Sequence, residues 1–286
     1  MTEAYPEWLK QRMPCPSQVD HVNLLLAGLS INTVCQSASC PNLGECFSEG
    51  TATFMILGST CTRRCRFCAV DKGMPAIPDH EEPSNISEAV RRLNLSYVVI
   101  TSPTRDDLPD GGAQHYTDTI NAIAASDPAV KIEVLIPDFR GSSDALQIVL
   151  DASPAVIGHN IETVPALYST VRPGAIYERS LEILAKIKQA RPDILTKSGL
   201  MLGLGESPLQ VIRVLNDLVA AGCDILTLGQ YLRPSIENLA VDRYIPPDEF
   251  AEYKQLAESL GFKAVISGPN VRSSHHAAGT YYETLA

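Results

Sequence analysis

The sequence lacks the features that would place the protein in a membrane or on nucleic acid. It has no apolar run of about 18 residues, which excludes a transmembrane helix. Its N-terminus has no basic stretch followed by an apolar one, so we expect no secretory leader. Its 33 acidic residues outnumber its 23 basic ones, which gives a net charge of −10. That balance argues against a nucleic-acid partner, because such partners select a basic surface.

Patterns typical of hydrolytic and nucleotide-binding enzymes are also absent. We find no serine nucleophile elbow, no phosphate loop and no paired-carboxylate site. The glycines of Gly203-Leu-Gly205-Glu206 are wrongly spaced for a dinucleotide fingerprint, so they either let the backbone approach a ligand or precede a helix cap at Ser207-Pro208. The histidines without a cysteine or carboxylate at ligand spacing are interpreted as structural; they are His21, His80, His115 and His159.

The sequence is rich in cysteine, and most of its cysteines are clustered. Six of the eight cysteines fall between residues 35 and 68, in two groups of three. The first group is Cys35, Cys40 and Cys46, and the second is Cys61, Cys65 and Cys68, with the spacing Cx3Cx2C. Disulfides pair cysteines and structural zinc takes four protein ligands, so neither rule fits groups of three. A zinc site with remote ligands stays open as an alternative.

Iron–sulfur chemistry fits groups of three cysteines better. A cubane cluster usually takes four thiolates, so three leave one iron free for another ligand. Free thiols at metal-type spacing also favour a reducing compartment, and we predict a cytoplasmic protein. The two remaining cysteines, Cys15 and Cys223, are interpreted as a bystander and a buried apolar thiol.

Apolar strands alternate with helical patterns from residue 53 onward. Strands are expected at residues 53–57, 97–101, 131–136, 155–159, 195–201 and 224–228, with a last short one at 263–266. Helices are expected at residues 87–93, 114–125, 144–150, 177–190, 209–221 and 248–260, the first capped by Ser84 or Asn85. Near-continuous apolar strands joined by helices predict a parallel sheet covered by helices, and six such units predict an open, partial barrel.

The predicted order of strands and helices places the second cysteine group, Cys61, Cys65 and Cys68, on the loop that follows the first strand. In parallel α/β proteins, functional sites are built at this carboxyl edge of the sheet. Three basic residues, Arg63, Arg64 and Arg66, lie among these cysteines, where they either favour ionised thiols or form salt bridges at a rim.

The motif Cx3Cx2C, with Phe67 before its last cysteine, resembles the signature of the radical S-adenosylmethionine (SAM) superfamily. With the upstream triad, the chain resembles the lipoyl synthases over roughly residues 6 to 276. The segments that carry the resemblance are CPNLGEC (40–46), GTATFMILG (50–58), CRFCAV (65–70), DDLPDGG (106–112), PDFRG (137–141), HNIETV (159–164), VRPGA (171–175), TKSGLMLGLGE (196–206), DILTLGQYL (224–232) and GPNVRSS (268–274).

The resemblance implies an α/β fold with a partial (β/α)6 TIM-type barrel at residues 51–262. An N-terminal extension, residues 1–50, and a C-terminal extension, residues 263–286, would carry an auxiliary iron–sulfur cluster. It also implies two 4Fe–4S clusters and SAM as co-substrate. The cluster on Cys61, Cys65 and Cys68 would bind SAM and cleave it reductively to a 5′-deoxyadenosyl radical.

The first triad would hold the auxiliary cluster, with a serine oxygen as its fourth ligand. In the resemblance this oxygen belongs to Ser274 of the Arg-Ser-Ser motif, with Ser273 as the alternative, and a further alternative is that both serines lie in solvent. A hard oxygen ligand on a cluster of soft thiolates should be easily released. The chain departs from the family at His275, where a tyrosine is expected, and at Pro103-Thr104.

SAM itself needs partners for its amine, carboxylate and ribose. We predict that Asn160 and Glu162 hold the ribose or the amine. Arg172 and the pair Lys197-Ser198 would meet the carboxylate, because cations suit anionic groups. Alternatively, Glu162 and Arg172 pair with each other or with neighbours.

The reaction implied by the resemblance is sulfur insertion at C6 and C8 of an octanoyl chain on a carrier lysine. The carrier would be the glycine cleavage H protein or a 2-oxoacid dehydrogenase E2 subunit. A donor such as ferredoxin or flavodoxin would supply electrons, and an iron–sulfur carrier would rebuild the spent auxiliary cluster. Two alternatives stay open: a radical SAM enzyme with a permanent second cluster, and an iron–sulfur scaffold or redox sensor without catalysis.

Overall fold

The computed structural model describes residues 6–9, 24–34 and 53–285. Cys15, His21 and all three cysteines of the first triad, Cys35, Cys40 and Cys46, lie outside the described residues, as does most of the predicted extension at 1–50. None of the helices within the described ranges is long and apolar enough to cross a bilayer.

Eight strands form one sheet in the order β1-β2-β5-β6-β7-β8-β9-β10. Every neighbouring pair is parallel except β1 with β2, which is antiparallel. The strands are β1 (Asn32–Thr33), β2 (Thr53–Met55), β5 (Tyr97–Thr101), β6 (Lys131–Leu135), β7 (Val156–Gly158), β8 (Leu195–Leu202), β9 (Ile225–Gln230) and β10 (Ala264–Gly268). The predicted parallel sheet is therefore confirmed, including its short last strand.

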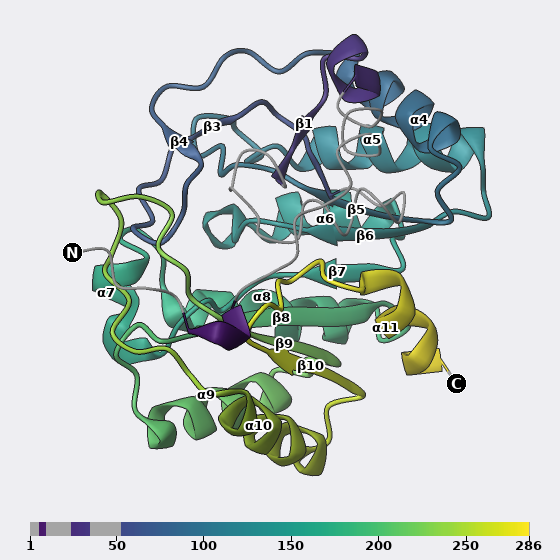
Figure 1. Cartoon of the computed structure of the whole chain (residues 1–286). Coiled ribbons are helices and arrows are strands. Elements are labelled where there is room, and N and C mark those ends of the chain that lie inside the picture. The colour runs from purple at the N-terminus through teal and green to yellow at the C-terminus, as the bar shows by residue number, and fades with distance from the viewer. Residues whose placement is uncertain (1–5, 10–23, 35–52, 286) are drawn as a thin grey trace.

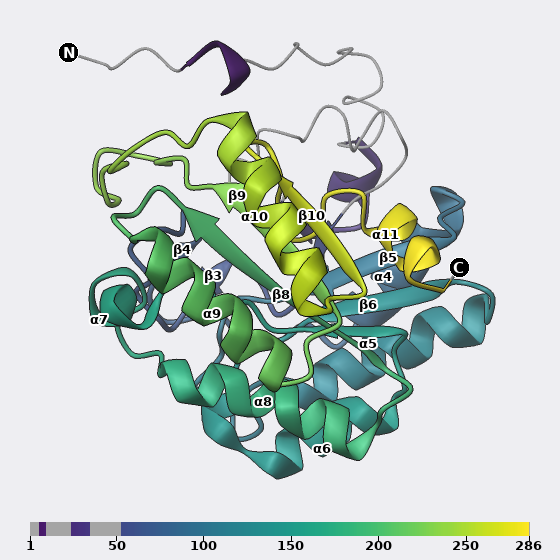
Figure 2. The same ribbon diagram turned by 90° about the horizontal axis from the view of Figure 1, so that it is seen from below.

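Six helices follow the parallel strands and cover the outer face of the sheet (Figure 1 and Figure 2). They are α4 (Glu82–Arg92), α5 (Ala113–Ser126), α6 (Ser143–Asp151), α8 (Tyr177–Ala190), α9 (Pro208–Ala220) and α10 (Pro247–Leu260). Five begin and end within one residue of the prediction. For α4 the predicted start was wrong: the helix begins at Glu82, so Ser84 and Asn85 lie inside it. Pro83 explains the early start, because proline is well suited to the first helical turn.

Short elements complete the described chain. They are η1 (Glu7–Leu9), η2 (Phe139–Gly141), η3 (Pro165–Leu167), α7 (Tyr168–Val171), α11 (Ala277–Leu285) and a small parallel pair, β3 (Thr60–Cys61) with β4 (Asp71–Lys72). The core between sheet and helices is apolar: Val98, Val134 and Leu226 are fully buried at its centre. Burial on both faces explains why the strands read as nearly continuous apolar runs.

Helix α11 closes the end of the sheet opposite the β3–β4 loop (Figure 1). Its Tyr281 packs against Tyr97 at the start of β5, with ring centroids 5.6 Å apart. The same tyrosine packs against a cluster of Val156, Leu195 and Ile225, which belong to β7, β8 and β9. One helix can contact strands so far apart in the sheet order only because the sheet is strongly curved. The sequence analysis did not predict this helix.

An ion-pair cluster at the amino-terminal edge of the sheet, just before β9, gives a stability prediction. Asp224 lies 2.5 Å from Lys188 Nζ and 3.0 Å from Lys263 Nζ. Burial raises the pKa of Asp224, but hydrogen bonds from both lysines and from the Thr196 amide leave it below its ordinary value. The stabilisation is thus present above the unfolded pKa, about 4, and is lost as pH falls through the folded pKa.

We expect Asp224→Asn to lower the free energy of unfolding at pH 7 by about 1–3 kcal/mol, because the amide lacks the charge that both lysines contact. Urea denaturation of both chains at pH 7 and at pH 3 measures this. The difference should shrink at the lower pH, where the aspartate of the parent chain takes up a proton. An equal difference at both pH values would contradict the electrostatic cause.

Candidate functional site

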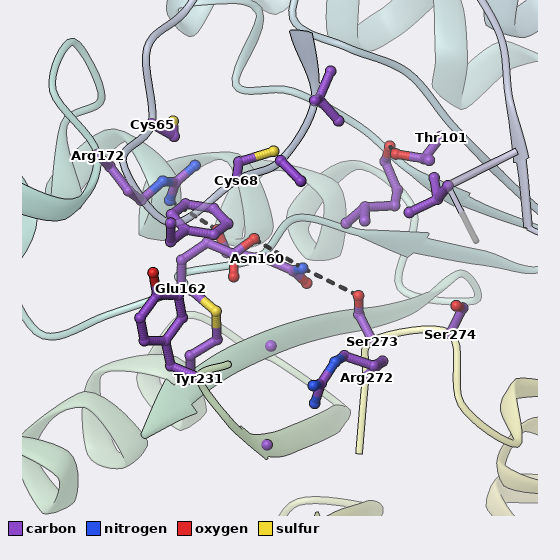
Figure 3. Close-up of a pocket in the computed structure, with 18 of the residues that line it drawn as sticks. Cys65, Cys68, Thr101, Asn160, Glu162, Arg172, Tyr231, Arg272, Ser273 and Ser274 are labelled. Carbon is purple, nitrogen blue, oxygen red and sulfur yellow. Dashed lines mark hydrogen bonds between the residues drawn. The ribbon is translucent and has the colours of Figure 1, made fainter. Parts of the chain in front are cut away.

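A cavity of about 730 Å³ opens at the carboxyl edge of the sheet. This volume is within the usual range of ligand pockets. Residues at the ends of β2, β5, β6, β8 and β9 line it; examples are Met55, Thr101, Leu135, Met201 and Gln230. Most of the residues predicted for the site line the same cavity: Cys61, Cys65, Phe67, Cys68, Asn160, Glu162, Arg172, Ser273 and Ser274 (Figure 3). Residues separated by more than 200 positions in the chain therefore meet there.

The loop that carries the three cysteines is fixed to three other loops. Thr62 N donates to Thr104 O (3.0 Å) in the loop after β5. Arg66 N donates to Val171 O (2.9 Å) at the end of α7. The Asn238 side chain, after β9, donates to Arg66 O and to Cys68 O, each at 3.1 Å. These contacts, together with the short β3–β4 pair, explain how this loop can hold three side chains toward a cavity.

The three thiols are free and half-buried. Burial raises the pKa of Cys65, and it raises the pKa of Cys68 to about 12. Two amides already face the Cys61 sulfur: Arg63 N at 3.4 Å and Thr104 N at 3.3 Å. Thiols in such a place ionise when a metal compensates their charge, since a coordinating thiol is deprotonated outright.

These donors fit an iron–sulfur cluster better than a single ion. Among the described residues, no group of three or more His, Cys, Asp or Glu side chains converges as a single metal ion would require. A cluster instead takes its thiolates on separate irons. Three cavity-facing thiols, with two amide donors to the Cys61 sulfur, suit a cluster with one open iron.

Arg63 forms salt bridges, and its charge also lowers the pKa of Cys65, so both interpretations offered for the arginines hold for this residue. It contacts Asp106 at 2.8 Å and Asp138 at 2.5 Å. Burial alone would lower the pKa of Arg63, but these carboxylates raise it above its ordinary value. The ion pairs tie the cysteine loop to the loops after β5 and β6. Arg64 and Arg66 are exposed. The sequence analysis gave no role to either aspartate, although both lie in segments that carried the resemblance.

Glu162 and Asn160 form the wall that faces the cysteines. Glu162 has φ of +65°, a left-handed conformation that is uncommon outside glycine and often found at functional sites. Hydrogen bonds from Glu162 N to Gly199 O (2.9 Å) and from Met201 N to Glu162 O (3.0 Å) hold it there. Burial raises the pKa of the Glu162 carboxyl group. Asn160 Oδ1 is buried and, within the described structure, has no hydrogen-bond partner.

Arg172 supports this wall from α7. Its Nη1 donates to Asn160 O (2.9 Å), Ile161 O (3.2 Å) and the Tyr168 hydroxyl (2.9 Å). Its Nε is buried without a partner among the described residues. Arg172 thus packs against its neighbours, as the structural alternative expected, and it also lines the cavity.

Lys197 and Ser198 do not line the cavity. Lys197 is 2% exposed and forms a buried ion pair with Glu133 at 2.7 Å. Ser198 donates to His159 O and accepts from Ile161 N. Both residues lie in the first half of β8, away from its carboxyl end.

The glycine-rich turn after β8 belongs to a helix start. Gly203 has φ of +98°, and Glu206 accepts from the amides of Gly203 (2.6 Å) and Leu204 (2.9 Å). Ser207 and Gln210 form a capping box at the start of α9. The capping alternative is thus confirmed.

Two of the histidines interpreted as structural have structural partners. Burial lowers the pKa of His159 to about 4, so the ring is neutral while it contacts Ile136 O and Ser180 Oγ. His115 lies 2.8 Å from Glu82, a carboxylate that its sequence position did not reveal.

The serine segment, residues 269–274, crosses back over β9 into the cavity. Its path depends on Gly229, where an added Cβ would lie 2.1 Å from Val271 O. Ser273 accepts a hydrogen bond from Asn160 Nδ2 at 3.1 Å, and Ser274 lines the cavity beside it (Figure 3). The two serines are half-buried, so the alternative that both lie in solvent is wrong.

The sequence of this chain is similar to those of proteins whose families are known. Residues 55–218 match the model of the radical SAM superfamily. A lipoyl synthase from Caldanaerobacter subterraneus subsp. tengcongensis is 54% identical over 97% of this chain and 97% of its own length. A lipoyl synthase from Chlorobium limicola is 54% identical over 95% of this chain and 93% of its own.

Solved structures are similar in fold only. SuiB of Streptococcus suis, bound to its precursor peptide SuiA, has a TM-score of 0.56 at 11% identity, over 94% of this chain and 58% of that one. Methylornithine synthase has a TM-score of 0.51 at 14% identity, over 88% of this chain and 84% of that one.

Proposed function

This chain belongs to the lipoyl synthase family within the radical SAM superfamily, and from that membership we propose how its residues carry out the family's reaction. The protein is a radical SAM sulfurtransferase that inserts two sulfur atoms into a protein-bound octanoyl chain. The proposal rests above all on one observation: three thiols and a serine segment from the far end of the chain face the same cavity.

Cys61, Cys65 and Cys68 hold the 4Fe–4S cluster in this proposal, and the cluster supplies the electron for reductive cleavage of SAM. Around it the chain binds and orients SAM. Glu162 and the unpartnered Asn160 Oδ1 accept hydrogen bonds from the amine or ribose, and Arg172 Nε donates to the carboxylate. Phe67 contributes to the wall of the cavity. Lys197 and Ser198 are left out, because they do not reach it.

A second 4Fe–4S cluster serves as the sulfur-donating substrate in this proposal. Its ligands are Cys35, Cys40, Cys46 and Ser274, with residues 1–50 and 263–286 as the extensions that carry it. The entry of Ser274 into the cavity supports this arrangement. A weakly held oxygen ligand makes this cluster the easier one to take apart.

The strongly curved sheet supports a partial (β/α)6 barrel over residues 51–262. Its interior keeps water from the reacting carbons. The family's reaction needs a lipoyl carrier as substrate and an electron donor. We propose an H protein or E2 carrier, a ferredoxin or flavodoxin as reductant, and an iron–sulfur carrier that rebuilds the spent cluster.

One single-turnover experiment tests the whole proposal. The chain, reconstituted without air, should carry about eight irons, since each cluster holds four. It is then given SAM, a reductant and an octanoylated carrier peptide. We expect two sulfur atoms in the product and loss of about four irons per chain. Product with all eight irons retained would mean a permanent second cluster, and a chain that takes up zinc or only four irons would contradict the proposal.

A further inference from the structure

The amide side chain of Asn160 contacts two sides of the cavity wall. Its Nδ2 donates to Glu162 Oε1 at 3.1 Å, on the SAM side, and to Ser273 Oγ at 3.1 Å, on the serine side (Figure 3). The two acceptors lie 111 positions apart in the chain (273 − 162 = 111). Its Oδ1 remains buried and unpartnered within the described structure.

Two neighbours define where this amide group lies. Arg172 Nη1 fixes the backbone carbonyl of Asn160 at 2.9 Å. Below the amide lies Gly199, where an added Cβ would stand 2.9 Å from Asn160 Oδ1. A ligand that hydrogen-bonds to Oδ1 would therefore fix the orientation of Nδ2 as well, because both atoms belong to one planar group.

Several contacts hold the first residues of the serine segment. Val271 O rests on Gly229, Val271 N donates to Gly268 O (3.1 Å), and Gln230 N donates to Pro269 O (3.3 Å). These contacts hold the beginning of the segment against β9. Ser273 lies beyond them, where its hydroxyl meets Asn160.

We propose that Asn160 is a positioning residue that couples SAM binding to the placement of the serine segment. This inference rests on the proposed function. Bound SAM fixes the amide through Oδ1, and the fixed Nδ2 holds Ser273 and, with it, the neighbouring Ser274. By linkage, a docked serine segment must strengthen SAM binding by the same factor. One hydrogen bond of this kind corresponds to about a 2- to 10-fold effect.

The test uses the reconstituted full chain and hydrogen–deuterium exchange of residues 269–276, without reductant, with and without saturating SAM. In the parent chain, SAM should slow exchange in this segment by about 2- to 10-fold. Asn160→Ala should abolish that protection. Asn216→Ala, which removes an exposed asparagine that contacts only Ile212 O on α9 in the described structure, should keep it.

Ser273→Ala separates coupling from SAM binding, because it leaves Asn160 and Glu162 intact. We expect it to lose the protection and to raise the SAM dissociation constant by about 2- to 10-fold. The double variant Asn160→Ala/Ser273→Ala should show no further loss of protection. Parent-level protection in Ser273→Ala, or no protection by SAM in the parent chain, would overturn the inference. An iron count below about eight in the parent chain would instead point to failure of the proposed function.

Discussion

Replacing Cys65 with alanine is expected to abolish SAM cleavage and to lower the iron content of the reconstituted chain from about eight to about four. A cluster that loses one of three thiolates has two irons without protein ligands. The neighbouring thiols have no reason to ionise without it, because burial raises the pKa of Cys68 to about 12. Iron counting and measurement of 5′-deoxyadenosine after addition of SAM and reductant check both results.

Cys223→Ala is the matched control. Cys223 is 5% exposed, lies away from the cavity, and donates to Ile225 O at 3.3 Å. Its loss should lower the free energy of unfolding by about 1 kcal/mol, as a small core truncation does, and leave iron and SAM cleavage unchanged. If Cys65→Ala kept its full iron content and still cleaved SAM, Cx3Cx2C would not be the cluster motif of this chain.

Replacing Ser274 with alanine should separate SAM cleavage from sulfur insertion. SAM binding and cleavage should persist, because the residues that face the cysteines are untouched. Sulfur insertion should fall by about 10- to 100-fold, the range for lost support at a metal site. The measurement is the ratio of lipoyl product to 5′-deoxyadenosine in a single turnover.

Ser259→Ala is the control for Ser274, since Ser259 is exposed on α10 and donates only to Leu256 O in the described structure. Comparison of Ser274→Ala with Ser273→Ala identifies which serine is the ligand of the auxiliary cluster. If Ser273→Ala loses sulfur insertion while Ser274→Ala keeps it, the serine ligand is Ser273. A full product yield from both variants would remove the serine segment from the sulfur-donating site.

Sequence reasoning succeeded where a local pattern carries the information. The strands were predictable because both faces of a parallel sheet are buried, which makes most residues of a strand apolar. The cysteine loop was predictable because it follows a strand, and strand ends meet at one edge of the sheet. Lys197 and Ser198 were predicted to meet the carboxylate of SAM, but they stand in the first half of β8 and do not line the cavity.

The contacts that were missed join residues far apart in the chain. Arg63 meets Asp106 and Asp138, which lie 43 and 75 positions away. Asn238 holds the cysteine loop from 172 positions away. Neither residue type nor spacing predicts such a pair, because a carboxylate or an amide finds partners equally well in solvent.

From the sequence alone came the cysteine spacing, the order of strands and helices, and through them the family and its chemistry. Those features depend on neighbours along the chain and on burial, both of which leave a periodic or spaced pattern. Only the tertiary structure decided that the serine segment enters the cavity, that Lys197 does not, and that Asn160 lies between Glu162 and Ser273. The curvature of the sheet decides these placements, because it brings the ends of distant strands around one space.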